Sequence, residues 1–144
     1  MSRWKYAKFL RNVPNAVDAL FGHDRGAPEV QRRALAEAVA VLEAAGIDYV
    51  GDEIYERRFN RLITLRPVAG SSRAGGSSWQ SLARRSGMIE ADQLNGEVVL
   101  LGRLHEVATP VNELLRRLAV ADARAGEPPG RHTEEEFLQM LERP

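Results

Sequence analysis

Residues 77–112, SSWQSLARRSGMIEADQLNGEVVLLGRLHEVATPVN, combine helical apolar periodicity with polar residues that this periodicity does not explain. Leu94, Val98 and Leu101 recur at spacings of three and four residues, as on a helix that buries one face. Gly96 lies inside this run, where a glycine costs about 1 kcal/mol relative to alanine. We therefore predict a short helix, a longer helix and the start of a third, with another backbone packed closely against Gly96.

The end of this stretch predicts where the third helix begins. Thr109 is followed by Pro110, and proline is tolerated at the first position of a helix. The Thr109 hydroxyl is expected to cap the helix by accepting a hydrogen bond from one of its unpaired N–H groups. The helix should run from Pro110 to about Arg124 and bury Leu114, Leu115 and Leu118.

Two strings within this part of the chain resemble a known family. SSWQSL (residues 77–82) and IEADQLNGEVVLLGRLHEVATPVNELL (residues 89–115) are similar to the C-terminal domain of ketopantoate reductase (2-dehydropantoate 2-reductase). The family pattern is Ser-Ser, then Glu-x-Asp-x-x-Asn-Gly, then Thr-Pro-x-Asn. The resemblance implies an all-α bundle similar to the C-terminal domain of 6-phosphogluconate dehydrogenase, and an NADPH-dependent oxidoreductase of pantothenate biosynthesis that reduces a 2-keto acid to a 2-hydroxy acid.

Composition sets broader limits on fold and partners. The length of 144 residues suits one domain. The 20 basic and 20 acidic residues cancel, so overall charge gives no reason to expect a nucleic acid or an anionic membrane surface as a partner. The chain has no cysteine, no apolar run long enough to span a bilayer and no signal-peptide core near its N-terminus. We expect a soluble cytoplasmic protein without a disulfide framework.

The first helix is expected from about Arg3 to Phe21. Its apolar side carries Tyr6, Leu10, Val13, Val17 and Leu20. Pro14 removes one backbone hydrogen bond from this run and is expected to kink the helix near Leu10. We treat the segment as one kinked helix.

The opposite side of this helix carries Lys8, Asn12 and Asn15. At about 100° per residue these side chains fall within roughly a 60° sector. Taken alone, they are better explained as the solvent-exposed face of an amphipathic helix. The family has a catalytic lysine in the pattern Lys-x-x-x-Asn, matched here by KFLRN, whereas Lys5 lacks that spacing. The resemblance therefore implies that Lys8 is catalytic and that Asn12 and Asn15 bind substrate.

Ser78 and Glu90 each have an ordinary and a functional explanation. Ser78 could cap a helix, and Glu90 could complement a helix dipole from the first turn. The family places a serine on the substrate carboxylate and, twelve residues later, a glutamate in the substrate and cofactor site. The resemblance thus implies that Ser78 binds substrate and that Glu90 binds both substrate and NADPH. We expect Asp92 and Asn95, from the same motif, to hold the helix start together.

The remaining segments are expected to be structural. Helices are predicted from about Pro28 to Ala45, stopped by Gly46, and over residues 51–63. The glycine- and serine-rich loop 66–76 lacks the spacing of a phosphate-binding loop. His105 has no partner at metal-ligand spacing, so no metal site is predicted, and it is interpreted as a helix-end residue.

The family resemblance also points to two departures in this chain. Glu106 and Ala108 replace the glycine and proline that usually precede Thr-Pro, which puts the stability of this turn in doubt. Gly75 stands where some members have a substrate-binding asparagine, so the 2-keto acid is left open.

The division of the chain into segments is predicted from the motifs near its C-terminus. Residues 1–126 are predicted to form the substrate and dimerisation domain. Residues 127–144 are predicted to be a linker and a short docked helix of the same domain, since Thr133 and Glu136 form a capping-box pattern before Phe137.

A complete family member begins with a dinucleotide-binding domain bearing GxGxxG, and this sequence has no such motif. Met1 lies just before the lysine helix. In the full enzyme NADPH would deliver hydride to the ketone while the lysine donates a proton. We therefore weigh two hypotheses: a substrate-binding half-enzyme that needs a dinucleotide-binding partner chain or domain, or a non-catalytic module for dimerisation or small-ligand binding. A homodimer is expected in either case.

Overall fold

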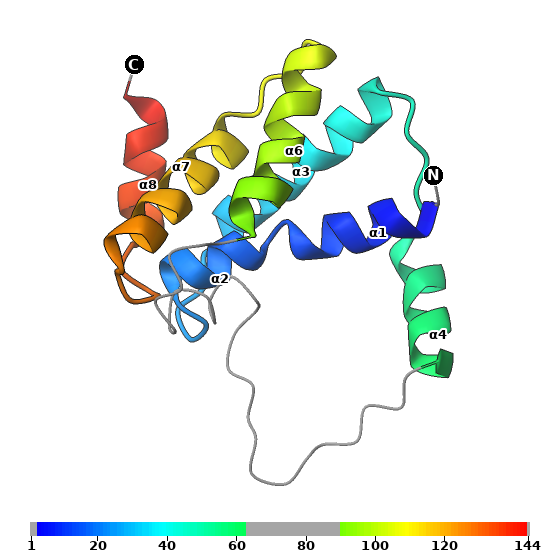
Figure 1. Ribbon diagram of the computed structural model, residues 1–144, viewed down its shortest axis with the longest axis horizontal. Helices are drawn as coiled ribbons and strands as arrows, with labels where there is room; N and C mark the ends of the chain where they lie inside the picture. The colour runs from blue at the N-terminus through cyan, green and yellow to red at the C-terminus, as the bar shows by residue number, and fades with distance from the viewer. Residues whose placement is uncertain (1–2, 63–89, 144) are drawn as a thin grey trace, which may run out of the picture.

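The computed structural model describes residues 3–62 and 90–143, and every regular element in these residues is an α-helix. In chain order the helices are α1 (Arg3–Asn12), α2 (Asn15–Phe21), α3 (Pro28–Ala44), α4 (Asp52–Leu62), α6 (Ala91–Leu104), α7 (Pro110–Ala125) and α8 (Glu134–Glu142). The bundle is built around α3, α6 and α7, with α8 against α7 on one side and α1 leading away to α4 on the other (Figure 1). The all-α prediction is confirmed. None of the helices in the described residues is both long and apolar enough to cross a bilayer.

The prediction of one helix from Arg3 to Phe21 is wrong, because the chain breaks into α1 and α2 at Val13 and Pro14. The Val13 amide donates to the Phe9 carbonyl at 3.0 Å and closes α1. Pro14 has no N–H, and the Val17 amide donates to the Pro14 carbonyl at 2.9 Å rather than to Val13. The break lies at the proline itself instead of near Leu10, and it leaves the Val13 carbonyl available to another donor.

Helix α3 follows the sequence prediction to within a residue at its end. Ala45 is the C-terminal cap, and Gly46 follows with φ of 65°, a left-handed conformation that glycine adopts without steric cost. The residues that α3 buries in the bundle are Val30, Ala34, Ala38, Val41 and Leu42. The alanine-rich stripe therefore faces the bundle, where α3 contacts α6 and α7.

Charged groups secure the first turn of α3. The Glu134 carboxylate of α8 accepts hydrogen bonds from the backbone amides of Glu29 at 2.7 Å and Val30 at 3.1 Å. The Glu29 side chain in turn accepts from Arg32 and Arg33, and these hydrogen bonds lower the pKa of Glu29 to about 2. The start of α3 is thus held both from within its own helix and by α8.

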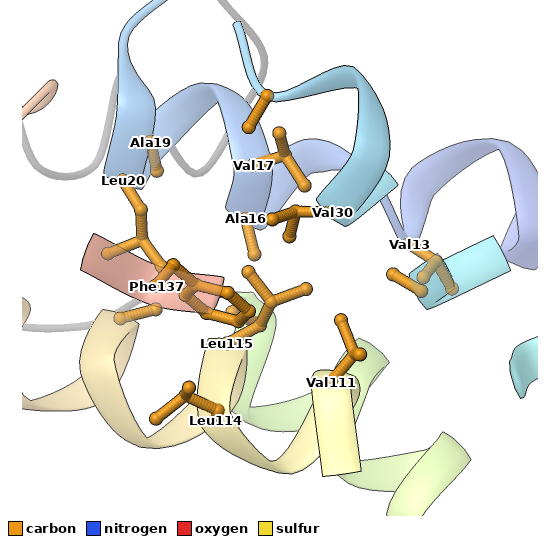
Figure 2. Close-up of a cluster of buried hydrophobic side chains, with 14 of the residues drawn as sticks. Val13, Ala16, Val17, Ala19, Leu20, Val30, Val111, Leu114, Leu115 and Phe137 are labelled. Carbon is orange, nitrogen blue, oxygen red and sulfur yellow. The ribbon is translucent and has the colours of Figure 1, made fainter. Parts of the chain in front are cut away.

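Helix α8 docks through one aromatic side chain. Phe137 is fully buried and meets Phe21 edge-on, with ring centroids 5.5 Å apart. Figure 2 shows Phe137 among Leu20 and Leu115, so the C-terminal segment shares the core of the preceding helices. The predicted capping box is present: the Glu136 amide donates to the Thr133 hydroxyl while the Thr133 amide donates to the Glu136 carboxylate.

The turn between α6 and α7 is tight. A Cβ on Gly102 would lie 2.7 Å from both the Val107 carbonyl oxygen and the Thr109 methyl carbon. Glu106 adopts φ of 57°, which is costly for a residue with a side chain and matches the predicted loss of a glycine there. His105 is the C-terminal cap of α6, as predicted.

Close backbone packing at Gly96 is not what the structure has. A Cβ there would first meet the Arg116 side chain, 3.3 Å from its Nε. The glycine that close packing requires is Gly102, because the chain reverses immediately after it.

Helix α4 lies at the edge of the bundle beside α1. Its predicted start is confirmed to within a residue, and residue 63, its predicted end, lies outside the described residues. The guanidinium of Arg58 lies over the Trp4 ring, 4.5 Å from its centroid, and Arg11 pairs with Glu56 at 2.6 Å. Polar and aromatic surface contacts therefore hold α4 to α1.

Candidate functional site

Lys8 and Asn12 project from one face of α1. Four residues of helix bring two side chains to within about 40° of each other. Lys8 is exposed and Asn12 is half-buried at the end of the helix. Among the residues that the structure describes, none forms an ion pair or hydrogen bond with the Lys8 ammonium.

Asn15 does not lie on the helix that carries Lys8 and Asn12. It is the first residue of α2, half-buried, on the far side of the break at Pro14. The 60° sector therefore applies only to Lys8 and Asn12, and the orientation of Asn15 relative to them depends on the break.

Glu90 lies at the N-terminus of α6. It occupies the N-cap position, where its backbone carbonyl accepts from the amides of Gln93 and Leu94, each at 2.9 Å. Its side chain is exposed and does not cap the helix. A helix N-terminus carries partial positive charge and attracts anions, which suits a site for a carboxylate substrate. Ser78, Gly75 and the loop 66–76 lie outside the described residues.

Asn95 connects the first turns of α6 to the break between α1 and α2. Its Nδ2 donates to the Val13 carbonyl at 3.4 Å and to Asn112 Oδ1 at 3.0 Å, and the side chain is fully buried. Asn12 precedes Val13 directly, and Asn15 follows two residues later. This contact brings the beginning of α6, which carries Glu90, to the helix junction flanked by the two asparagines (Figure 1).

Asn112 and Glu37 continue this network to α3. Asn112 Nδ2 donates to the Ala34 carbonyl at 3.0 Å and to Glu37 Oε2 at 2.8 Å. Glu37 also accepts from the backbone amides of Val111 at 2.9 Å and Asn112 at 3.0 Å. The carboxylate of α3 thus caps the N-terminus of α7.

The predicted cap by Thr109 is therefore wrong. Thr109 is the N-cap residue of α7, but its side chain makes no capping hydrogen bond, because Glu37 already accepts from the first free amides of the helix. Pro110 at the first position is as predicted. The sequence did not predict Glu37 as the cap of α7. Its one sequence signal is that an acidic residue stands beside Ala38, next to an otherwise apolar stripe.

The prediction that Asp92 and Asn95 hold the start of α6 together is also wrong. Asp92 is exposed and pairs with Arg116 of α7 at 2.7 Å. Asn95 makes its bonds to Val13 and Asn112 instead. Both residues join α6 to its neighbours, because they lie on the side of the helix that faces α7.

The described residues fit neither a metal ion nor a whole dinucleotide. They contain no group of three or more His, Cys, Asp or Glu residues placed to hold a metal. They also contain no strand, and the phosphate-binding turn of a dinucleotide fold lies between a strand and a helix.

A groove of about 540 Å³ lies between α1 and α3, with Leu10 and Pro14 on one side and Leu35 and Val39 on the other. Lys8, Asn12, Asn15 and Glu90 do not line it. The candidate site is therefore the surface around the α1–α2 junction and the start of α6, separate from this groove.

Comparison with known proteins gives a consistent result. The family described as "Ketopantoate reductase PanE/ApbA C terminal" matches residues 1–122. A 2-dehydropantoate 2-reductase from Caulobacter vibrioides is 34% identical over 129 residues, which cover 83% of this chain and 40% of the relative. One from Halobacterium salinarum is 33% identical over 129 residues, covering 84% and 40%.

The fold has a solved counterpart. The crystal structure of a PanE/ApbA family ketopantoate reductase from Ralstonia eutropha JMP134 is similar with a TM-score of 0.62 and 27% identity, over 84% of this chain and 41% of that protein. The chain spans about 40% of the length of the curated relatives it matches.

Proposed function

Because the chain belongs to the ketopantoate reductase family and matches its C-terminal domain, we propose that it supplies the substrate-binding and proton-donating half of an NADPH-dependent 2-keto acid reductase. The observation that carries this proposal is the junction of α1, α2 and α6. There the exposed Lys8 shares a helix face with Asn12, and the Val13–Asn95 hydrogen bond draws in the start of α6. The cation and the helix N-terminus suit the negative charge of a small keto acid, and the carboxamides can form hydrogen bonds with its oxygens.

The proposed role of Lys8 follows from the chemistry of carbonyl reduction. Addition of hydride to a ketone carbon leaves negative charge on the oxygen, which must then be protonated. A lysine ammonium near that oxygen stabilises the charge and donates the proton, and proton transfer of this kind contributes about 10² to 10⁴ in rate. Exposure of Lys8 without a competing carboxylate among the described residues leaves the ammonium free for this task.

The other residues are assigned to binding. Asn12 and Asn15 have donors and acceptors that can orient the keto acid, and Glu90 can accept hydrogen bonds from substrate or cofactor hydroxyl groups. Ser78 is proposed to bind the substrate carboxylate on the strength of the family motif. NADPH supplies the hydride when bound, and a dinucleotide-binding domain, on this or another polypeptide, is required to hold it.

The proposal is tested with a chimera in which residues 1–122 replace the matching C-terminal part of the Caulobacter vibrioides relative. The purified chimera is first checked for helical content and for NADPH binding by fluorescence. We then expect NADPH oxidation that depends on added ketopantoate. A folded chimera that binds NADPH but oxidises it no faster with ketopantoate than without would refute the proposal.

A second candidate function is favoured by one surface. Leu100 and Leu104 lie one turn apart on α6 and are 52% and 66% exposed. Adjacent exposed leucines of this kind suit a protein partner, including a second copy of the chain, and so favour a non-catalytic dimerisation module. A dimer in light scattering that becomes monomeric in Leu100→Glu, together with an inactive chimera, would select this alternative.

A further inference from the structure

The orientation of the Asn95 carboxamide is fixed by its surroundings. Its Nδ2 faces two acceptors, the Val13 carbonyl and Asn112 Oδ1. Turning the group over would place Oδ1 against the same two oxygens, so only one orientation forms hydrogen bonds. In this orientation Oδ1 is buried and accepts no hydrogen bond from the residues that the structure describes.

Asn112 is fixed in the same way. Its Nδ2 donates to the Ala34 carbonyl and to Glu37, so its Oδ1 must face Asn95. Each donor in the chain from Val13 to Glu37 therefore points in a set direction. This network joins the α1–α2 junction, α6, α7 and α3.

The Val13 carbonyl, which accepts from Asn95, is the group that loses its helical hydrogen bond at the break. In a continuous helix Val13 would accept from the Val17 amide, which here donates to Pro14. Asn95 supplies the replacement donor, and an unpaired buried carbonyl would be costly. The bond thus stabilises the bent arrangement of α1 and α2, in which the Val17 amide does not donate to the Val13 carbonyl.

We propose that Asn95, held by Asn112 and Glu37, is a positioning residue that sets the angle between α1 and α2 and thereby places Lys8 and Asn12 relative to Glu90. The inference rests on the proposed function for its catalytic consequence. Lys8 precedes Val13 by five residues and Glu90 precedes Asn95 by five, so each lies about 7.5 Å along its helix from the same hydrogen bond. A change of angle at this contact therefore moves the two groups relative to each other.

The two hydrogen bonds that Asn95 Nδ2 donates support a role beyond packing. An apolar side chain could fill an ordinary core position, but it has no N–H to donate to the Val13 carbonyl or to Asn112 Oδ1. Asparagine is needed where a donor must reach the Val13 carbonyl.

The first test measures amide hydrogen exchange of the full chain by NMR in Asn95→Leu. The matched control is Val99→Ala, which loses buried apolar surface on the same helix without losing a hydrogen bond. We expect exchange of the Val13 and Val17 amides to accelerate about tenfold or more in Asn95→Leu relative to the control, while amides in the middle of α7 stay unchanged. Equal acceleration in all helices would overturn the inference. If Asn95→Leu does not fold, Asn95→Ser takes its place with the same expected pattern.

The second test measures kinetics of the same variants in the chimera. We expect kcat for ketopantoate to fall about tenfold in Asn95→Leu with the KM for NADPH unchanged, and neither to change in Val99→Ala. Faster exchange at the break with unchanged kcat would overturn the positioning role. An unmutated chimera without activity would overturn the proposed function alone, and the exchange pattern would still decide whether Asn95 anchors the break.

Discussion

The Glu37 carboxylate offers a sharp test of how α7 is capped. It accepts three hydrogen bonds, from the amides of Val111 and Asn112 and from Asn112 Nδ2, at 2.8 to 3.0 Å. Glu37→Ala removes all three acceptors. Thr109→Val is the matched control, because it removes the hydroxyl at the N-cap position while keeping the branched shape that packs on Gly102.

The size of the effect follows from these contacts. A hydrogen bond to a charged group contributes about 1.5–3 kcal/mol, and loss of a cap costs about 1 kcal/mol. Glu37 is half-buried, so water can replace part of what is lost, and Asn112 Nδ2 keeps its bond to Ala34. We therefore expect Glu37→Ala to lower the free energy of unfolding by about 2–4 kcal/mol, and Thr109→Val by less than about 0.5 kcal/mol.

Urea unfolding followed by circular dichroism measures both variants. Glu37→Gln, which keeps one acceptor oxygen, should fall between alanine and the unmutated chain. A loss in Thr109→Val as large as that in Glu37→Ala would show that the threonine caps α7 and would refute this assignment.

Three further predictions concern the bundle. Because hydrogen bonds from Arg32 hold the folded pKa of Glu29 at about 2, below its ordinary value of 4.5, its contribution is complete above pH 4.5 and is lost as pH falls toward 2. The stability difference between Glu29→Gln and the unmutated chain should therefore vanish over that range in acid titrations of unfolding. Gly102→Ala should destabilise the fold by about 2 kcal/mol or more, since its Cβ would overlap backbone, whereas Gly96→Ala should be neutral or stabilising by up to about 1 kcal/mol, which thermal unfolding would show. Glu106→Gly should raise stability by about 0.5–1 kcal/mol by relieving the positive φ, and an unchanged melting temperature would contradict this.

The helical fold could be read from the sequence because its signals are local. Apolar spacing and the flanking proline and glycine placed α3 to within a residue, and the Thr133–Glu136 pattern identified the cap of α8. These features depend on residues within one or two turns of each other, which sequence spacing reports directly.

The errors arose where distant residues compete for the same groups. Whether Pro14 kinks or divides a helix depends on a donor such as Asn95, which is 82 residues from Val13. Likewise the cap of α7 is Glu37 and not Thr109, and Glu37 lies 74 residues from Val111 in sequence. Neither partner can be identified from local pattern, because the choice is made by tertiary packing.

For the site, sequence spacing correctly placed Lys8 and Asn12 on one helix face, since both lie within α1. The spacing does not fix the direction of Asn15, because the angle was counted through the break between α1 and α2. The roles of these residues in substrate binding and catalysis remain predictions from the family motif.

The most direct test of the account is the effect of Lys8→Ala on ketopantoate reduction by the chimera, with Lys5→Ala as the control. Both lysines are exposed on α1, but only Lys8 has the four-residue spacing to Asn12. We expect Lys8→Ala to lower kcat by about 10² or more, with NADPH binding intact, and Lys5→Ala to have little effect. Equal activity of Lys8→Ala and Lys5→Ala would contradict the assignment of the proton donor and, with it, the proposed half-site.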